Sequence, residues 1–220
     1  MRFDIITIFP DIIKSYTDES IIKRAVARKL LKIDIHDLRN FASGKHKKVD
    51  DKPYGGGPGM VMKAEPVIKA VKSLKPKKQE TIIITFSPAG KEFNAAYARK
   101  LAAQKNLILI ADRYEGMDER VKKILKSEYR LKTFSIGPYV VTGGELPSLI
   151  VLDAVARHIP NVLGKEESLE EKRYGVGVPV YTRPKIIKIK GKKYSVPKVL
   201  TSGNHEQVEM WRKKNKKPNF

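Results

Sequence analysis

Three short segments of the chain carry residue types that could bind a small ligand or take part in chemistry. They are Ser87–Lys91 (SPAGK), Arg113–Arg120 (RYEGMDER) and Ser135–Ser148 (SIGPYVVTGGELPS). The second places a carboxylate, Glu115, directly after an aromatic ring, Tyr114. The third is rich in glycine, which lets a backbone approach a ligand closely at some cost in stability. Together these segments predict a pocket for a small, nucleotide-like ligand, but they do not name a reaction.

One further side chain, Arg157, stands near the end of the apolar segment that follows the glycine-rich stretch. A cation there could act on a substrate, or it could simply complement the negative end of a helix dipole. Asp153 lies one helical turn earlier and could pair with it. Glu145, at the start of the same segment, suits the positive end of the dipole.

Common catalytic and cofactor motifs are missing from the sequence. Neither Tyr54–Met60 (YGGGPGM) nor the glycine-rich stretch matches a Walker A loop or a dinucleotide fingerprint. There is no G-x-S-x-G elbow. The chain has no cysteine, which excludes disulfides, thiolate zinc sites and cysteine nucleophiles. The four histidines are His36, His46, His158 and His205. Their spacing matches no metal-binding motif, so we expect no dedicated metal site.

The charge balance is strongly basic, with 45 Lys and Arg against 24 Asp and Glu and a formal net charge of +21 over 220 residues. Such a surface attracts polyanions, so nucleic acid is the expected partner. The alternative is that scattered lysines only keep the protein soluble. However, Lys190–Tyr194 (KGKKY) and Trp211–Phe220 (WRKKNKKPNF) are clustered beside aromatic residues. No stretch suits a signal peptide or a membrane span, which favours a cytoplasmic protein.

Hydrophobic periodicity predicts strands that alternate with helices. We expect strands at Phe3–Phe9, Leu31–Leu38, Thr81–Phe86 and Leu107–Asp112, and helices at Pro10–Leu30 (with a break near Thr17–Ser20), Lys63–Leu74, Asn94–Gln104 and Glu145–Ile159. This order predicts an α/β fold with a largely parallel sheet. Ligands bind beyond the carboxyl ends of parallel strands, so we expect the three segments to converge on one pocket.

After Pro160 the pattern weakens. Leu163–Pro184 has no clear period and is typical of a long loop. The remainder predicts two short strands around Gly191 and a terminal helix that is capped near Ser202–Asn204. We therefore divide the chain into residues 1–160, the main domain, 161–178, a linker that carries an active-site loop, and 179–220, a small, basic, mainly helical domain.

Six motifs resemble those of the TrmD family of bacterial tRNA (guanine-N1)-methyltransferases, and they occur in the family's order. They are VDDKPYGGGPGMVM, RYEGMDERV, SIGPYVVTGGELP, VLDAVARHIPNVLG, YTRP and LTSGNH, and they span nearly the whole chain. The resemblance implies a SPOUT-class methyltransferase whose parallel sheet carries a deep trefoil knot, which no general rule of topology would predict. It also implies a homodimer with its active site at the subunit interface, and a C-terminal domain that binds tRNA.

The resemblance implies S-adenosylmethionine as the methyl donor, held in a bent form by the glycine-rich loop. Backbone groups of that loop would bind the adenine and ribose, while Gly143 and Gly144 would let the chain pass close to the ligand. For Ser87–Lys91, a plain tight turn is an equally good interpretation. The residues implied to bind the cofactor are Ser87, Pro88, Asp112, Tyr114, Gly116, Ser135, Ile136, Gly137, Pro138, Tyr139, Val140, Val141, Gly143, Gly144 and Pro147.

The reaction implied is methyl transfer to N1 of the guanine immediately 3′ of the anticodon. N1 carries a proton, so the enzyme needs a base, and it needs a cation for the charge that develops on O6. Arg157 matches the family's cation, Glu115 matches a glutamate near the reacting groups, and Asp50 helps to position the guanine. The residues implied to meet the RNA are Asp50, Gly59, Lys190, Lys192, Ser202, Asn204, His205 and Arg212.

The sequence departs from the family pattern where the general base is expected. The position of the family's aspartate falls on Lys172, so Glu171, or failing that Glu170, is the expected base. The alternative is that these glutamates form a solvated acidic run. Asp112 stands where the family often has glycine. Two other functions stay open: a tRNA-binding homologue that has lost catalysis, and a SPOUT methyltransferase for another RNA.

Overall fold

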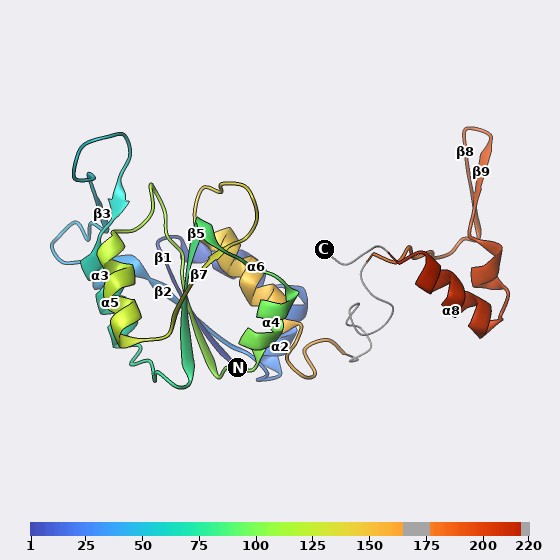
Figure 1. Cartoon of the computed structure of the whole chain (residues 1–220), viewed down its shortest axis with the longest axis horizontal. Helices are drawn as coiled ribbons and strands as arrows, with labels where there is room; N and C mark the ends of the chain where they lie inside the picture. The colour runs from blue at the N-terminus through green and yellow to red at the C-terminus, as the bar shows by residue number, and fades with distance from the viewer. Residues whose placement is uncertain (165–176, 217–220) are drawn as a thin grey trace. The chain divides into compact units, whose positions relative to one another are not determined.

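The computed structural model describes residues 1–164 and 177–216, and the chain folds as two compact units, Met1–Val162 and Leu163–Phe220 (Figure 1). The larger unit contains the main sheet and two hydrophobic clusters. Within residues 177–216, the smaller unit contains a hairpin and two helical segments.

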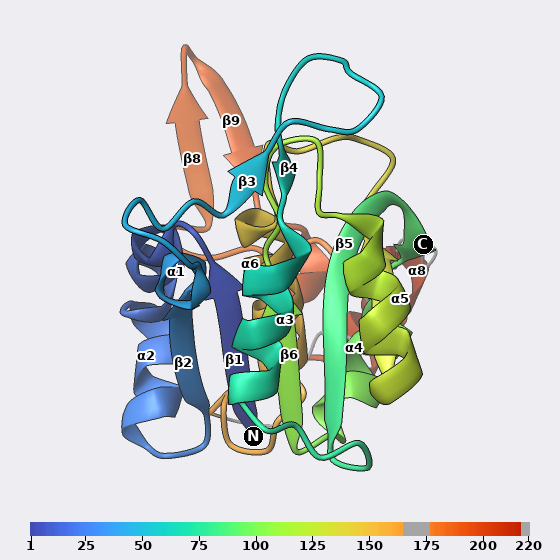
Figure 2. The same cartoon turned by 90° about the vertical axis from the view of Figure 1, so that its left-hand side faces the viewer.

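A five-stranded sheet forms the centre of the larger unit, in the order β2-β1-β6-β5-β7 (Figure 2). Every neighbouring pair in it is parallel. Its strands are β1 (Arg2–Thr7), β2 (Lys32–Asp37), β5 (Thr81–Glu92), β6 (Asn106–Ile110) and β7 (Leu131–Ser135). Runs of isoleucine and leucine suit central strands that are covered on both faces. The predicted α/β class with a parallel sheet is therefore confirmed.

Helices cover both faces of this sheet. One face carries α1 (Pro10–Thr17), α2 (Ser20–Ala27), α4 (Ala95–Ala102) and α6 (Glu145–Ala156), and the other carries the short 3-10 helix η1 (Leu38–Phe41), α3 (Ala64–Ser73) and α5 (Glu119–Glu128). Side chains alternate along a strand, so consecutive residues of β5 belong to different clusters. Ile82 and Ile84 pack with the first group of helices, and Ile83 packs with the second.

The predicted helix at Pro10–Leu30 breaks as expected. The first helix ends at Thr17, and the second begins at Ser20, whose φ of 51° lies outside the helical region. The helix α5 is an addition that periodicity did not indicate. Only Val121 and Leu125 of it are buried, which is too few apolar positions for a clear pattern.

The expected loop Ser87–Lys91 needs a correction. The strand β5 continues past Phe86 to Glu92, and its pairing with β7 shifts register because both Phe86 and Lys91 pair with Phe134. The segment is therefore a bulge within a strand, and a bulge re-aims the chain at the end of a sheet.

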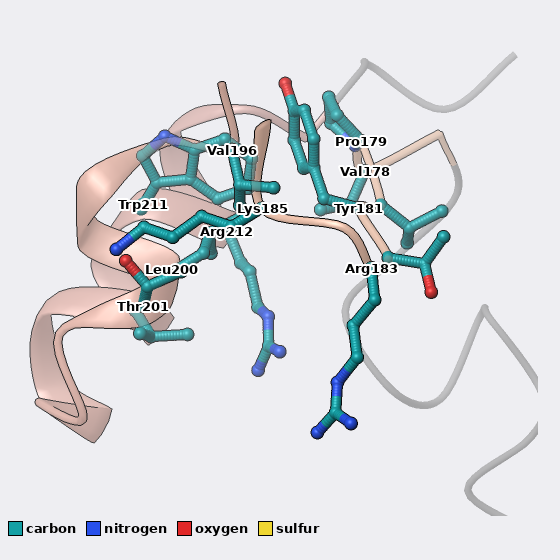
Figure 3. Close-up of a pocket in the computed structure, with 13 residues that line it drawn as sticks. Val178, Pro179, Tyr181, Arg183, Lys185, Val196, Leu200, Thr201, Trp211 and Arg212 are labelled. Carbon is teal, nitrogen blue, oxygen red and sulfur yellow. The ribbon is translucent and has the colours of Figure 1, made fainter. Parts of the chain in front are cut away.

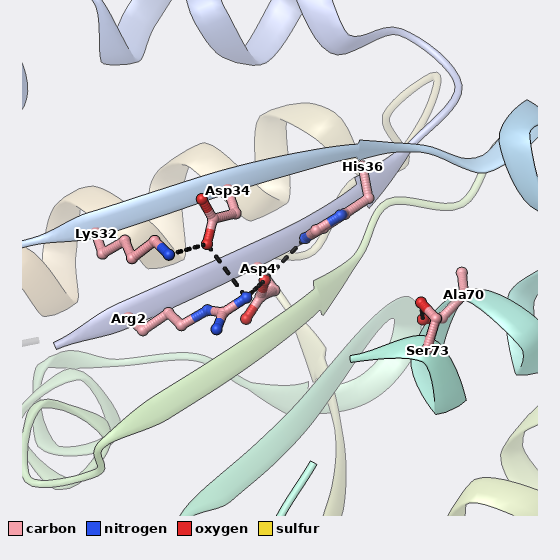
Figure 4. Close-up of polar contacts among 7 residues, drawn as sticks. All are labelled: Arg2, Asp4, Lys32, Asp34, His36, Ala70 and Ser73. Carbon is pink, nitrogen blue, oxygen red and sulfur yellow. Dashed lines mark hydrogen bonds and ion pairs between the residues drawn. The ribbon is translucent and has the colours of Figure 1, made fainter. Parts of the chain in front are cut away.

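Charged residues cluster near the β2 edge of the sheet, on β2 and on its neighbour β1 (Figure 4). Asp4 is buried, and its carboxylate accepts from Arg2 and from His36, each at 2.8 Å. Burial alone would raise the pKa of Asp4, but these two hydrogen bonds outweigh it and lower the pKa. Asp34 forms ion pairs with Arg2 and Lys32 at 3.2 and 3.3 Å. Charges of this kind discourage another strand from pairing with the edge.

A small antiparallel ladder, β3 (Asp50–Asp51) and β4 (Val61–Met62), lies outside the main sheet and brackets the YGGGPGM segment. Two backbone hydrogen bonds tie this segment to the loop after β6. Met62 N–H donates to the Gly116 carbonyl at 2.9 Å, and Glu115 N–H donates to the Met60 carbonyl at 3.0 Å. The segment is thereby fixed at the carboxyl edge of the sheet.

The smaller unit consists of β8 (Ile186–Ile189), β9 (Lys192–Ser195), the 3-10 helix η3 (Lys198–Thr201) and α8 (His205–Lys214). Lys190 and Gly191 have φ of 46° and 77°, as a tight two-residue hairpin turn requires. The predicted pair of strands, the turn and the capped terminal helix are confirmed. No helix in the described ranges is long and apolar enough to cross a bilayer.

Candidate active site

The three segments singled out in the sequence surround one cavity of about 390 Å³. The first is the bulge after Phe86, the second is the loop that follows β6, and the third is the loop between β7 and α6. All three lie at the carboxyl edge of the sheet, where parallel strands leave room for a ligand. The volume falls within the range of small-molecule pockets.

Most residues expected to bind a cofactor line this cavity. They are Ser87, Pro88, Asp112, Tyr114, Gly116, Ser135, Ile136, Tyr139, Val140, Val141, Gly143, Gly144 and Pro147. Gly137 and Pro138 belong to the same loop but not to the cavity wall. A side chain at Gly137 would overlap the Tyr139 ring, which folds back on the loop and donates from its hydroxyl to the Ile136 carbonyl at 3.0 Å.

Gly143 and Gly144 make room for the chain itself as well as for a ligand. A Cβ on Gly144 would lie 2.6 Å from Ala111 Cα, and the Gly144 N–H donates to the Asp112 carbonyl at 2.7 Å. A Cβ on Gly143 would collide with the Arg113 side chain. The glycine-rich loop therefore crosses directly over the end of β6, a contact that the sequence interpretation did not include.

A buried ion pair fixes this crossing. Arg113 Nε lies 2.7 Å from Glu145 Oε2, and Glu145 is fully buried. The other carboxylate oxygen of Glu145 accepts from the Thr7 hydroxyl at 2.7 Å, and the Arg113 guanidinium lies 4.7 Å from the centre of the Phe9 ring. Buried charges are tolerated when they are paired and hydrogen-bonded. Glu145 therefore joins the end of β1, the loop after β6 and the start of α6, a role beyond the expected dipole contact.

Asp112 places a carboxyl group in the cavity wall. Burial raises its pKa to about 6, and the charge of Glu145 adds to the rise while Lys122 opposes it. A carboxyl that titrates near neutrality in a cavity of ligand size is a candidate for ligand contact.

Glu115 also lines the cavity and lies against Gly59. A Cβ on Gly59 would come within 2.6 Å of a Glu115 carboxylate oxygen, so only glycine leaves room for this side chain. Burial raises the pKa of the neighbouring Tyr114, and the charge of Asp50 adds to the effect. The structure thus brings Gly59 next to Glu115 and Asp50 near Tyr114, and both Tyr114 and Glu115 line the cavity.

Arg157 lies at the far end of α6 and does not line the cavity. The helix begins at the cavity with Glu145, and a rise of about 1.5 Å per residue puts its two ends roughly 18 Å apart. Asp153 accepts from the Tyr16 hydroxyl at 2.8 Å, and burial together with this bond raises the pKa of Tyr16 to about 12. The expected bases Glu170 and Glu171, and Lys172 beside them, lie outside the described residues.

The residues expected to meet RNA in the smaller unit fall into two groups. Lys190 and Lys192 are exposed at the hairpin tip, and Arg212 lines a separate cavity of this unit. Ser202 and Asn204 build the start of α8. Asn204 accepts from the Gln207 N–H at 3.1 Å, and Ser202 accepts from the Asn204 N–H at 3.1 Å. These two side chains have a structural task, and His205 is the first residue of the helix that they cap.

The sequence interpretation missed Arg113 as a partner of Glu145, and it missed Glu119 and Lys122 in the cavity wall. The sequence singles out Arg113 and Glu145 separately, because both stand inside motifs, but no local pattern indicates that they pair. Glu119 and Lys122 lie on α5, whose existence was not predicted. Among the described residues, no group of three or more metal-binding side chains comes together.

Comparisons with known proteins agree with this architecture. Residues 1–219 match the family described as tRNA (Guanine-1)-methyltransferase TrmD. A relative from Dictyoglomus turgidum is 48% identical over 217 residues, which cover 97% of this chain and 84% of the relative. Relatives from Geobacter metallireducens and Clostridioides difficile are 44% and 43% identical, with 97% of this chain covered in each case and 85% and 91% of the relatives. All three are named tRNA (guanine-N(1)-)-methyltransferase. The chain belongs to the TrmD family.

Proposed function

We propose that this protein transfers a methyl group from S-adenosylmethionine to N1 of the guanine immediately 3′ of the anticodon in tRNA. The names of its relatives support the reaction class. The observation that carries the proposal is the cavity built from all three motif segments at the carboxyl edge of the sheet. The cytoplasm, where tRNA is modified, is the proposed location.

The cavity fits the cofactor in size and in the character of its walls. Many of the lining residues belong to the glycine-rich loop, whose backbone N–H and C=O groups can read an adenine edge without side chains. The loop holds this shape because Gly144 packs on Ala111 and because Glu145 pairs with Arg113. When bound, S-adenosylmethionine supplies an electrophilic methyl group on a sulfonium. Asp112 and Glu115 would add negative charge beside that cation.

A homodimer would complete the site. Arg157 lies too far along α6 to reach the cavity of its own chain, so we propose that the partner subunit's Arg157 holds the developing charge on guanine O6. The outer face of α6 supports a dimer contact here. Leu146 and Ile150 lie four residues apart on it, are 55% and 43% exposed, and are apolar. Tyr16 is also exposed and hydrogen-bonds to α6 through Asp153.

The proton on guanine N1 needs an acceptor. We retain Glu171 as the proposed base, with Glu170 as the substitute, because they stand beside the position of the family's aspartate. A second source is Glu115, an exposed carboxylate that the structure places in the cavity wall against Gly59. In this arrangement Asp50 would help to position the guanine from the same side.

The proposal extends to the organisation of the chain. Residues 1–160 would bind the cofactor, 161–178 would link the domains and carry the active-site loop, and 179–220 would bind tRNA. The main domain would contain the deep trefoil knot of SPOUT enzymes. The crossing of the glycine-rich loop over the end of β6, with Gly144 bonded to Asp112, supports this topology.

A methylation assay on purified tRNA transcripts tests the proposal. The guanine that follows the anticodon would be varied to adenine, and the modified position would be mapped. We expect methyl transfer to the guanine transcript and none to the adenine transcript. Cofactor and tRNA binding without any transfer would instead favour the homologue that has lost catalysis. Methylation of other RNAs in preference would favour a different SPOUT substrate.

A further inference from the structure

The smaller unit has a cavity of its own, of about 660 Å³, to which the proposed reaction gives no role (Figure 3). Two aromatic side chains, Tyr181 and Trp211, stand in its wall together with three cations, Arg183, Lys185 and Arg212. Among the described residues that line it, none is acidic. This combination differs from the wall of the larger unit's cavity, which contains Asp112, Glu115 and Glu119.

The Tyr181 ring is open to a ligand, and the partly buried Trp211 ring lies beside it. The ring centres of Tyr181 and Trp211 are 6.2 Å apart, with an angle of 61° between the planes, and Tyr181 is 51% exposed. Aliphatic side chains of Leu200 and Val208 complete the apolar part of the wall. A flat, apolar-faced group could therefore lie against the tyrosine while it contacts aliphatic carbon on another side.

Arg183, Lys185 and Arg212 line the same cavity as the rings and the aliphatic side chains. Such a wall suits a ligand in which an anion is attached to a flat group. Figure 3 shows the side chains of Arg183 and Arg212 extending to the same side, away from the rings. Residues 177–216 hold eleven Lys and Arg against two acidic residues, so the whole unit favours a polyanion. Guanidinium groups bind phosphate oxygens through paired hydrogen bonds.

We propose that this cavity binds one unpaired nucleobase of the RNA substrate, stacked on Tyr181 beside Trp211, with its flanking phosphate between Arg183 and Arg212. Proteins recognise single-stranded RNA by stacking splayed bases on aromatic rings and guanidinium planes. The proposal rests on the proposed function for its choice of RNA as the ligand. It deepens that function by placing base recognition in the smaller unit, away from the reacting guanine.

A protein surface is the competing occupant, and the charges argue against it. An apolar patch that docks protein is depleted in charge at its centre, whereas this wall presents three cations to whatever enters. Nucleic acid satisfies the cations and the rings together, because each nucleotide carries one phosphate and one flat base.

The chain offers a direct probe, since Trp211 is its single tryptophan. Full-length protein would be titrated with a short single-stranded oligoribonucleotide while tryptophan fluorescence is followed. An abasic oligonucleotide of the same length and charge is the control. We expect strong quenching by the base-bearing oligonucleotide and little by the abasic one. Equal quenching by both would overturn base stacking and leave only a phosphate site.

A matched pair of variants tests the tyrosine. Tyr181→Phe keeps the ring, and Tyr181→Leu keeps apolar bulk without it. We expect Tyr181→Leu to weaken oligonucleotide binding at least about fivefold, at the lower end of the effect of removing a stacked aromatic, and Tyr181→Phe to bind like the parent. Unchanged binding by Tyr181→Leu would overturn the proposal, as would a change in its oligomeric state with RNA binding intact, which would assign the wall to a protein contact.

The two proposals fail separately. The fluorescence titration needs neither methyl donor nor turnover, so quenching without methylation of any transcript removes the proposed reaction and leaves the base pocket. Methylation that proceeds while no quenching occurs removes the pocket and leaves the reaction. In the methylation assay, Tyr181→Leu should raise KM for tRNA more than it lowers kcat, whereas a general loss of folding would lower kcat as well.

Discussion

The cavities of the two units differ in what holds their walls. In the larger unit, the loops that line the cavity are fixed by the Gly144–Asp112 backbone hydrogen bond and by the Glu145–Arg113 ion pair. In the smaller unit, most of the residues that line the cavity are exposed. The first cavity is a preformed shape for a small molecule, while the second presents rings and cations to a flexible polyanion.

This difference predicts which kinds of change each region tolerates. A preformed cavity fails when a single methyl group displaces backbone, because the interior is close-packed and has no space to yield. A charged surface weakens gradually, because each cation contributes a separable share of the attraction to phosphates. Substitutions in the two units should therefore differ in both the size and the salt dependence of their effects.

The largest effect is expected for Gly144→Ala. The added Cβ would lie 2.6 Å from Ala111 Cα, a backbone atom that cannot move without shifting β6. Affinity for S-adenosylmethionine, measured by calorimetry, should fall by about 100-fold or more, the upper end of the cost of overpacking, which is typically about 1–3 kcal/mol and occasionally more. Gly143→Ala should be milder, because it meets only the Arg113 side chain.

Gly164→Ala is the control for these glycine variants, since a Cβ there meets nothing within 4 Å. It should bind the cofactor like the parent. A folded Gly144→Ala protein with parental affinity would show that the wall is not preformed, and it would erase the contrast between the two cavities.

The next effect is expected for Arg157→Ala. Removal of a cation that holds transition-state charge slows the chemical step by about 10²–10³-fold. Single-turnover methylation should fall by that factor while cofactor affinity stays close to the parental value. A rate within a few-fold of the parent would leave Arg157 as a helix-end cation only.

Mixing Arg157→Ala with Gly144→Ala subunits sharpens the same test. If each site takes its cavity from one chain and its arginine from the other, half of the randomly mixed dimers regain one intact site. The mixture should then recover about a quarter of the parental activity. No recovery after subunit exchange would place Arg157 and the cavity of the same chain in one site, against the roughly 18 Å length of α6.

The sequence was a good guide to the elements and a partial guide to the site. Short apolar runs such as Thr81–Phe86 predicted the strands, because an apolar run is a local property of the sequence. The alternation of these runs with helical segments predicted that the sheet is parallel. Motif spacing predicted which loops meet. The Arg113–Glu145 pair could not be predicted, because its partners stand 32 residues apart and meet only when the glycine-rich loop crosses β6. Arg157 shows the same limit, since its relation to the cavity depends on the length and direction of α6.

A smaller effect, on stability, is expected for Asp112→Asn. Because burial raises the pKa of Asp112 to about 6, ionisation of this group destabilises the folded state as pH rises through 6. The variant should therefore be more stable than the parent at pH 8, by at most about 3 kcal/mol for a shift of roughly two units. Below the unfolded-state pKa, near 4, the difference should vanish. Thermal unfolding across pH measures it.

Asp118→Asn serves as the control, because its change in stability at pH 8 should have the opposite sign. The hydrogen bond from Arg120 lowers the pKa of Asp118, so its charge stabilises the folded state above the unfolded pKa. The variant should lose stability at pH 8 and match the parent at low pH. If Asp112→Asn behaves in this way instead, the carboxyl of Asp112 has a charged partner, and the cavity wall is not the low-polarity surface inferred from its burial.

The smallest effect concerns charge in the smaller unit. Lys190 and Lys192 are exposed at the hairpin tip and are expected to contact phosphates. The double variant Lys190→Ala/Lys192→Ala should weaken tRNA binding modestly and reduce the slope of log K against log salt by about 1.4–1.8, since each lost phosphate contact removes roughly 0.7–0.9. Cofactor affinity should not change, because neither lysine lines the larger unit's cavity.

Lys77→Ala/Lys78→Ala is the matched control, because it removes the same charge from exposed positions in the turn before β5. That turn lies at the amino edge of the sheet, whereas the cavity lies at the carboxyl edge. A diffuse field of +21 charges would make the two pairs equivalent, since long-range attraction depends mainly on total charge. If tRNA instead releases counterions at defined contacts, only the Lys190/Lys192 double variant should show a reduced slope. Equal slopes for both double variants would therefore assign tRNA binding to net charge, and would show that the smaller unit has no specific RNA-binding surface at the hairpin tip.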